Sequence, residues 1–158
     1  MSMGTNGALA GIGLIMADAS RKSRERATSI LDRAGLRPTR QRRLLTQVLF
    51  EHGDRHVTAE QLHSEAELEG VTISLATVYN TLHQFLAAGL VREVVIEAGR
   101  AYFDTNVSYH HHLYNEANGQ LVDIPGDLVD PGLLPDIPKG YTVDRIDVVV
   151  RLRSDMGE

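Results

Sequence analysis

The sequence predicts an α+β protein in which a helical N-terminal half precedes a shorter, strand-rich C-terminal half. Within residues 20–88, capping residues and glycines delimit four predicted helices, the first of them basic. From residue 90 onward the pattern changes to short runs rich in β-branched residues, separated by glycine-containing turns. A chain of 158 residues, 42% hydrophobic and 23% charged, fits one ordinary soluble domain or two small ones.

The first predicted helix spans residues 20–34 and ends at Gly35. Before it, residues 8–17 form an apolar run of ten residues, which is too short to span a bilayer. No basic residue precedes this run, so it makes a poor signal peptide. We therefore expect residues 1–19 to form a flexible N-terminal arm, with Met16 as an alternative translation start.

Two further helices follow at capping signals. Thr39 is placed to cap a helix that runs to about Glu51, and its apolar stripe is Leu44, Leu45, Val48 and Leu49. The segment Thr58-Ala59-Glu60-Gln61 is a capping box, which predicts a third helix ending near Glu69.

The fourth predicted helix, residues 75–88, has an unusual outer face. Ser74 can cap it and Gly89 ends it. Its outer face is small, polar and uncharged, and consists of Ala76, Thr77, Asn80, Thr81 and Gln84. Ordinary surface helices carry charged outer faces, so this face suits insertion into a groove.

A predicted hairpin follows, with strands at residues 90–96 and 100–104 around Glu97-Ala98-Gly99. Helices followed by a two-stranded hairpin predict a winged helix-turn-helix over residues 20–105. In this arrangement helix 75–88 reads DNA and the hairpin is the wing.

The remaining segment, residues 106–158, contains three predicted strands and little helix. The strands are 108–115, 120–124 and 141–153, with a turn at Asn118-Gly119 and a proline-rich loop between the last two. So small a sheet cannot build a sufficient core alone. We therefore expect a small α/β dimerisation domain with a three-stranded sheet that pairs with a second copy.

Charge is distributed unevenly along the chain. The net charge is −5, yet residues 21–43 hold nine basic and two acidic residues. A local basic block on an acidic chain predicts a surface for a polyanion such as duplex DNA. The alternative is an ordinary solvated, charged helix.

Three consecutive histidines, His110, His111 and His112, form the strongest ligand signal. On a strand, His110 and His112 point to one face and His111 to the other. The chain has no cysteine, so any metal must be held by nitrogen and oxygen. An exposed polar strand is the alternative reading.

Residues 30–124 resemble the ferric uptake regulator superfamily. The resemblance depends on three segments, which are residues 55–62, residues 73–82 and residues 110–113. Residues 121–126, the proline-rich connection and residues 148–152 are most similar to the iron response regulator branch. The resemblance implies a cytoplasmic, dimeric, non-enzymatic regulator of iron uptake and haem biosynthesis genes. The implied partners are duplex DNA, a second copy and a haem-delivering protein, with no membrane.

The resemblance also implies a regulatory metal site between the two domains. Its ligands would be His56, Asp104, His110, His112 and Asp123, a set that suits iron, manganese or zinc. The Cys-x-x-Cys zinc motifs of many relatives are absent. A further site loses its histidine, because Ile146 stands in that place. The Cys-Pro haem motif is absent too, which assigns haem to His110, His111 and His112.

For DNA contacts, the predicted base-reading residues lie on helix 75–88 and are Thr77, Tyr79, Asn80 and Gln84. Asparagine and glutamine can bond adenine bidentately, which predicts an AT-rich target. The predicted phosphate contacts are Arg40, Arg42 and Arg43.

Three alternatives stay open at this point. A peroxide- or manganese-responsive regulator would keep the fold and change the signal. A plain dimerisation module with a vestigial metal site would bind DNA identically with and without metal. A metallohydrolase would need a general base, for which Glu116 is the only obvious residue near the histidines, and the chain has no nucleophile elbow or phosphate loop.

Overall fold

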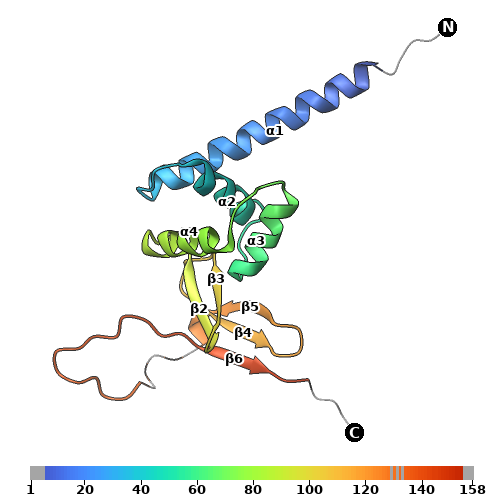
Figure 1. Cartoon of the computed structure of the whole chain (residues 1–158). Coiled ribbons are helices and arrows are strands. Elements are labelled where there is room, and N and C mark those ends of the chain that lie inside the picture. Colours follow the sequence, from blue (N-terminus) through green and yellow to red (C-terminus); the bar gives the residue numbers. More distant parts are fainter. Residues whose placement is uncertain (1–5, 129, 131, 133, 155–158) are drawn as a thin grey trace. The chain divides into compact units, whose positions relative to one another are not determined.

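The computed structural model describes residues 6–128, 130, 132 and 134–154. The chain divides after Val107 into two compact units, and Figure 1 traces the elements of each. Among the described residues, unit 1 contains four helices and one three-stranded sheet, and unit 2 contains a second three-stranded sheet. This order confirms the predicted α+β class.

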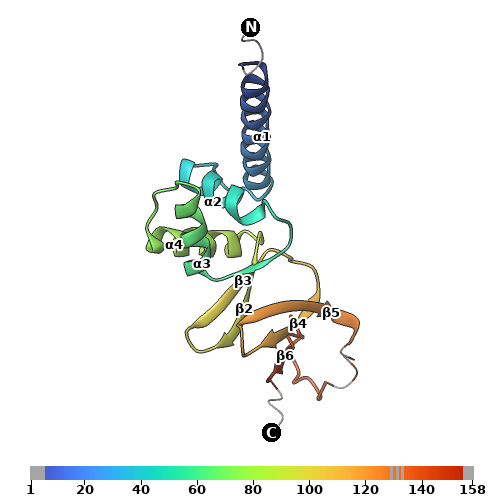
Figure 2. The same ribbon diagram turned by 90° about the vertical axis from the view of Figure 1, so that its right-hand side faces the viewer.

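Helix α1 (Asn6–Arg33) is longer than the sequence predicted. Figures 1 and 2 show one continuous helix that extends beyond α2. The helical backbone over residues 6–19 replaces the arm expected there, and residues 1–5 of that arm lie outside the described residues. Alanine, leucine and methionine are strong helix formers and no proline interrupts the segment, so the helix continues across it. No helix in the described part of the chain is long and apolar enough to cross a membrane.

Helices α2 (Arg40–Phe50), α3 (Ala59–Leu68) and α4 (Leu75–Ala87) begin where their capping residues predicted. The Thr39 side chain accepts from the Arg42 N–H, and the Ser74 side chain accepts from the Thr77 N–H. Thr58 forms both halves of a capping box. These local bonds satisfy backbone donors that have no partner inside the helix.

The core of unit 1 lies where the apolar stripes of the helices meet. Its fully buried members include Leu31 of α1, Leu45 of α2, Leu62 of α3 and Phe85 of α4. Burial of a side chain of this size contributes about 1.5–3 kcal/mol. Thr81, which was expected on the outer face of α4, is buried instead. The outer face of α4 is therefore narrower than predicted.

The sheet of unit 1 has the order β1-β3-β2, with both pairs antiparallel. Strands β2 (Arg92–Glu97) and β3 (Arg100–Asp104) form the predicted hairpin, and Gly99 takes the positive φ of 81° that its turn requires. Strand β1 (His56–Val57) was not predicted, because two residues are too few to show an alternating pattern.

The sheet of unit 2 has the order β5-β4-β6. Strands β4 (His110–Asn115) and β5 (Gln120–Pro125) form an antiparallel hairpin, while β6 (Val149–Leu152) runs parallel to β4. The last strand is shorter than the predicted range 141–153, because charged residues interrupt the alternation before residue 148. Helical structure among the described residues of this unit is limited to 3₁₀ turns, including η1 (Gly126–Leu128).

Candidate metal centre and nucleic-acid interface

In unit 1 the candidate ligands gather around Asp104 at the end of β3. The strand register places His56 on one side of Asp104 and Arg92 on the other. The Asp104 Oδ2 atom lies 3.6 Å from His56 Nε2 and 3.9 Å from Arg92 Nε, and the Asp104 side chain is fully buried. The backbone N–H of Asn106 donates to the other carboxylate oxygen at 2.8 Å. One oxygen of Asp104 is thus fixed by the backbone, and the second faces an imidazole and a guanidinium.

In unit 2 three predicted ligands converge on one face of the sheet. The alternation of β4 places His110 and His112 on that face, and Asp123 of β5 is the cross-strand partner of His112. The two Nε2 atoms are 3.1 Å apart. Asp123 Oδ1 lies 3.4 Å from His110 Nε2 and 3.9 Å from His112 Nε2. The sequence predicted this convergence from strand alternation and the hairpin.

A backbone contact fixes the orientation of the His110 ring. Its Nδ1 atom lies 2.9 Å from the Ser108 carbonyl oxygen, which can only accept. Nδ1 therefore carries a hydrogen, and Nε2 faces His112 and Asp123. Histidines that bind metals commonly donate their other N–H to a carbonyl or carboxylate in this way.

The spacing of these three atoms fits a divalent ion. At metal–ligand distances of about 2.1 Å, adjacent ligand atoms lie about 3.0 Å apart in an octahedron and about 3.4 Å apart in a tetrahedron. The observed distances of 3.1, 3.4 and 3.9 Å lie in or just above this range, so a small inward movement of the ligand atoms would suffice to bind an ion. Two imidazole nitrogens and a carboxylate oxygen form a set that first-row divalent metals accept.

The same geometry does not suit a haem. Two axial ligands on opposite sides of one haem iron need nitrogen atoms about 4 Å apart, at about 2.0 Å per bond, whereas His110 Nε2 and His112 Nε2 are 3.1 Å apart. His111 points to the opposite face, is fully buried and packs edge-on against the Tyr109 ring. In this conformation the triplet presents no exposed imidazole for haem.

Comparison with known proteins decides the family. The sequence model of the Ferric uptake regulator family matches residues 33–145. The chain belongs to this family. It is 37% identical to the Ferric uptake regulation protein of Shigella flexneri over 101 residues, which are 63% of this chain and 68% of that protein. Against the protein of the same name from Vibrio cholerae it is 34% identical over 98 residues, 61% and 65% of the two chains.

Solved structures give the same result. The Vibrio cholerae ferric uptake regulator matches with a TM-score of 0.66 and 25% identity, covering 80% of this chain and 98% of that one. The ferric uptake regulator from Pseudomonas aeruginosa with manganese matches with a TM-score of 0.62 and 28% identity, covering 82% and 98%. The chain is thus a metal-responsive, DNA-binding regulator of the family and not an enzyme. The narrower assignment to the iron response regulator branch is a proposal.

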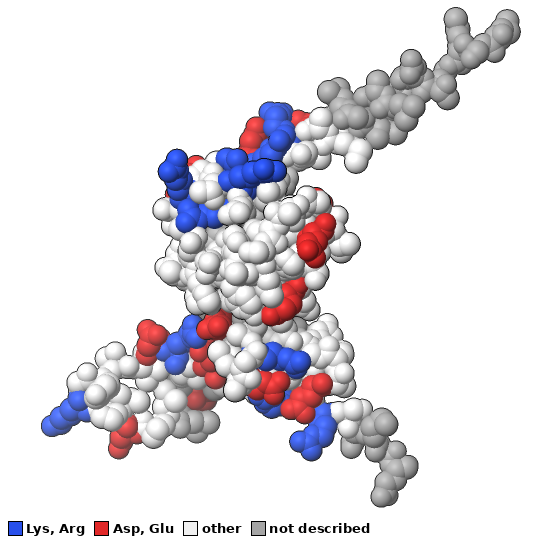
Figure 3. Space-filling view, in the orientation of Figure 1, with Lys and Arg blue, Asp and Glu red and all other residues white. Residues whose placement is uncertain are grey.

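In unit 1 of this ferric uptake regulator family chain, Lys and Arg gather over α1 and the start of α2 (Figure 3). The surface over α4 is mainly uncharged in the same view, which agrees with the predicted reading helix. Asn80 and Gln84 are exposed on α4, whereas Thr77 is half-buried and its hydroxyl lies 2.8 Å from that of Ser74. The Thr77 side chain therefore contacts the N-cap residue of α4 and is only partly available on the outer face of the helix.

Tyr79, 37% exposed on α4, is tied to helix α3. Its hydroxyl donates to Glu60 Oε1 at 2.6 Å. This bond lowers the pKa of the Glu60 carboxyl and raises the pKa of the Tyr79 phenol. His83, one turn further along α4, is also exposed, with its ring centre 6.3 Å from that of Tyr79. His83 follows Tyr79 by four residues, so the two side chains lie on the same side of α4.

The three arginines of α2 differ in their surroundings. Arg40 is exposed, and Arg43 is half-buried with its Nη1 donating to the Pro38 carbonyl oxygen at 3.2 Å. Arg42 Nε donates to Gln84 Oε1 at 2.9 Å, which joins a predicted phosphate contact to a predicted base contact.

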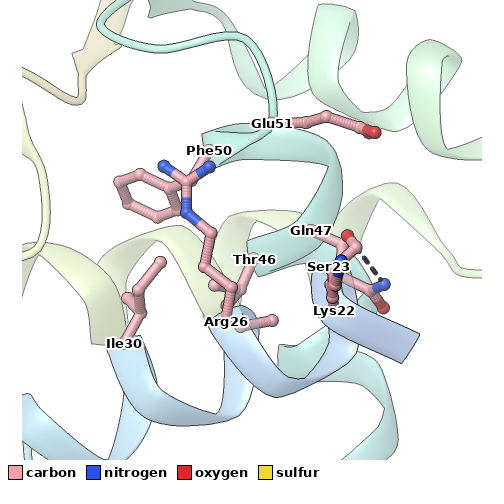
Figure 4. Close-up of a pocket in the computed structure, with 9 residues that line it drawn as sticks. Lys22, Ser23, Arg26, Ile30, Thr46, Gln47, Phe50 and Glu51 are labelled. Carbon is pink, nitrogen blue, oxygen red and sulfur yellow. Dashed lines mark hydrogen bonds between the residues drawn. The ribbon is translucent and has the colours of Figure 1, made fainter. Parts of the chain in front are cut away.

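A pocket with a volume of about 230 Å³ is lined mainly by residues of α1 and α2 (Figure 4). Gln47 Nε2 donates to Ser23 Oγ at 3.2 Å beside it, shown as a dashed line in the figure. Its lining combines apolar, neutral polar and charged side chains, with Ile30, Phe50, Arg26 and Glu51 among the residues, and the predicted metal ligands are not among them.

Proposed function

We propose that the chain is a cytoplasmic, homodimeric regulator of iron uptake and haem biosynthesis genes, in the iron response regulator branch of its family. Its DNA affinity would be set by a divalent iron, manganese or zinc ion. The observation that carries the proposal is the convergence of the His110, His112 and Asp123 ligand atoms within 3.1–3.9 Å of one another.

We further propose that the ligand groups of the two units serve one ion. His56 and Asp104 provide an imidazole and a carboxylate in unit 1, and unit 2 provides two imidazoles and a carboxylate. Neither group alone supplies the four to six protein ligands of a closed site. A bound ion would supply positive charge that offsets both carboxylates. Shared ligation would make the placement of α4 relative to unit 2 depend on ion binding.

Homodimer formation through unit 2 is supported by its exposed apolar side chains. Leu113 pairs with Val122 on one side and Val150 on the other, so the three share one face of the sheet. Val122, Val150 and the nearby Leu152 are all exposed in the single chain. A second copy that covers this face would bury them and place two reading helices on duplex DNA.

We propose that haem competes with the metal ion for the same histidines. Haem ligation by His110 or His112 would need the same Nε2 atoms that converge on Asp123, and it would also need these buried rings to leave the conformation described above. Haem binding and metal binding are therefore expected to exclude each other. Delivery of haem by a partner protein is a further expectation from the resemblance.

Operator binding by the purified full-length chain tests the proposal. Duplexes from the promoters of iron uptake and haem biosynthesis genes are titrated with chelator-treated, Mn²⁺-loaded and haem-loaded protein. We expect a change of about 5–150-fold in affinity between the chelated and the Mn²⁺-loaded protein, and its absence in a His110→Ala/His112→Ala variant. Identical affinity in every state would show a vestigial metal site.

The peroxide-responsive alternative is tested in the same preparation. The Fe²⁺-loaded chain is treated with peroxide and its histidines are mapped by mass spectrometry. Oxidation of His110 or His112 together with loss of DNA binding would favour that alternative over the iron-responsive regulator. Unchanged histidines would favour the proposal.

A further inference from the structure

Arg42 of α2 and Gln84 of α4 form a fixed pair at the outer face of the reading helix. Arg42 Nε donates to Gln84 Oε1 at 2.9 Å, and Arg42 Nη1 donates to the Arg37 carbonyl oxygen at 2.9 Å. The guanidinium is therefore held at two points. Gln84 is itself exposed, so the pair lies at the surface of α4, the helix proposed to read DNA.

The bond between them changes what Gln84 can read. Bidentate reading of adenine requires the amide oxygen to accept from the adenine N6 group while the amide nitrogen donates to N7. Here the amide oxygen already accepts a charge-assisted hydrogen bond from Arg42. Gln84 is thus left to offer mainly its two N–H donors.

Arg42 offers donors as well. With Nε and Nη1 engaged, Nη2 carries two more N–H groups, and a guanidinium has no acceptor. The outward-facing groups of the pair are therefore donors. Among the bases, guanine presents two acceptors side by side in the major groove, O6 and N7, and bidentate arginine is its commonest partner.

We propose that Arg42 and Gln84 act as one unit that reads a guanine in the major groove, with Arg42 as a specificity-determining residue. This differs from the sequence-based expectation, in which Gln84 reads adenine and Arg42 only neutralises phosphate. The inference rests on the proposed reading of DNA by α4.

Arg43 provides a matched control. It is the next residue on α2, carries the same charge and is also half-buried, but it donates to the Pro38 carbonyl oxygen and not to a residue of α4. A lysine at either position keeps the charge and loses the planar fork. Arg42→Lys and Arg43→Lys should therefore have similar salt dependence and different base preference.

The experiment selects duplexes from a randomised library with the Mn²⁺-loaded, full-length chain. We expect the selected sites to contain a guanine at which replacement by 7-deazaguanine, which lacks the N7 acceptor, weakens binding about tenfold. With Arg42→Lys or Gln84→Met the preference for this guanine is lost, and the deaza replacement changes affinity about twofold or less. Arg43→Lys keeps the preference. Circular dichroism and thermal melting confirm that each variant is folded, and Arg42→Lys suffices if Gln84→Met does not fold.

Two results overturn the inference. One is an unchanged guanine preference in Arg42→Lys, and the other is a uniform loss of affinity for all duplexes in both arginine variants. Either result leaves the proposed regulator intact, provided that the unaltered chain selects a sequence. If the unaltered chain selects no sequence in any metal state, the proposed function itself fails.

Discussion

Asp104 of β3 pairs with His56 of β1 on one side and with Arg92 of β2 on the other, in the same antiparallel sheet. The imidazole and the guanidinium both approach the same carboxylate oxygen, Oδ2. Asp104, a predicted metal ligand, thus lies beside the buried guanidinium of Arg92. Arg92 was not among the residues that the sequence predicted for the metal site. The charge of Arg92 acts directly on the oxygen that would bind an ion.

Arg92→Gln should therefore raise the affinity for Mn²⁺. Removal of a positive charge near the Asp104 carboxylate reduces repulsion of the ion, by an amount on the order of 1.4 kcal/mol or about tenfold. Competition with a fluorescent chelator measures the constant. Arg100→Gln is the control, because Arg100 lies in the same sheet and contacts the exposed Glu97 at 3.5 Å. Weaker binding by Arg92→Gln than by the control would contradict the role of Arg92.

Replacement of neighbouring histidines should separate metal binding from packing. His112→Ala removes a nitrogen that lies 3.1 Å from His110 Nε2, and metal affinity should fall about 100-fold. His111→Ala removes a fully buried ring on the opposite face and should lower stability by about 1–3 kcal/mol. Its metal affinity should stay within about threefold, measured by the same titration beside thermal unfolding. Equal losses of metal affinity in both variants would mean that strand alternation does not define the site.

The bond between Tyr79 and Glu60 should hold over a defined range of pH. The folded-state pKa of Glu60 is lowered from 4.5, so its contribution is present above that value and is lost as the pH falls through the lowered pKa. The folded-state pKa of Tyr79 is raised from 10.0, so its contribution is present below that value and is lost as the pH rises through the raised pKa. In Glu60→Gln the Tyr79 pKa should return toward 10.0, measured by NMR of labelled tyrosine. Glu97→Gln, which alters the carboxylate that contacts Arg100, should leave the Tyr79 pKa as it was.

The sequence predicted those features that depend on residues close together in the chain. Thr39, Thr58 and Ser74 each cap a helix with a bond to the residue three positions further on, and β4 alternates as expected. The missed features depend on distant partners. Arg42 and Gln84 are 42 residues apart in the chain, and Tyr79 and Glu60 are 19 apart. No local pattern reports such pairs, since they arise only when helices pack.

The predicted start of the first helix at residue 20 was wrong for a different reason. The apolar run at residues 8–17 has no polar face, so its periodicity gives no helix signal, and only the intrinsic helix propensity of its alanine, leucine and methionine residues favours a helix. The structure continues α1 through it. Strand β1 was not predicted, because its two residues form a strand only by pairing with β3.

Loss of the capping box of α3 should measurably destabilise unit 1. Thr58 Oγ1 accepts from the Gln61 N–H at 3.2 Å, and Gln61 Oε1 accepts from the Thr58 N–H at 2.8 Å. Thr58→Ala removes the first bond and should cost about 1 kcal/mol of the free energy of unfolding. Thermal unfolding measures the loss, which corresponds to a fall of about 4–8 °C in Tm for a domain of this size. Thr72→Ala is the control, because Thr72 is exposed in the loop before α4. An equal fall in Tm in both variants would mean that the loss of stability does not come from the capping box.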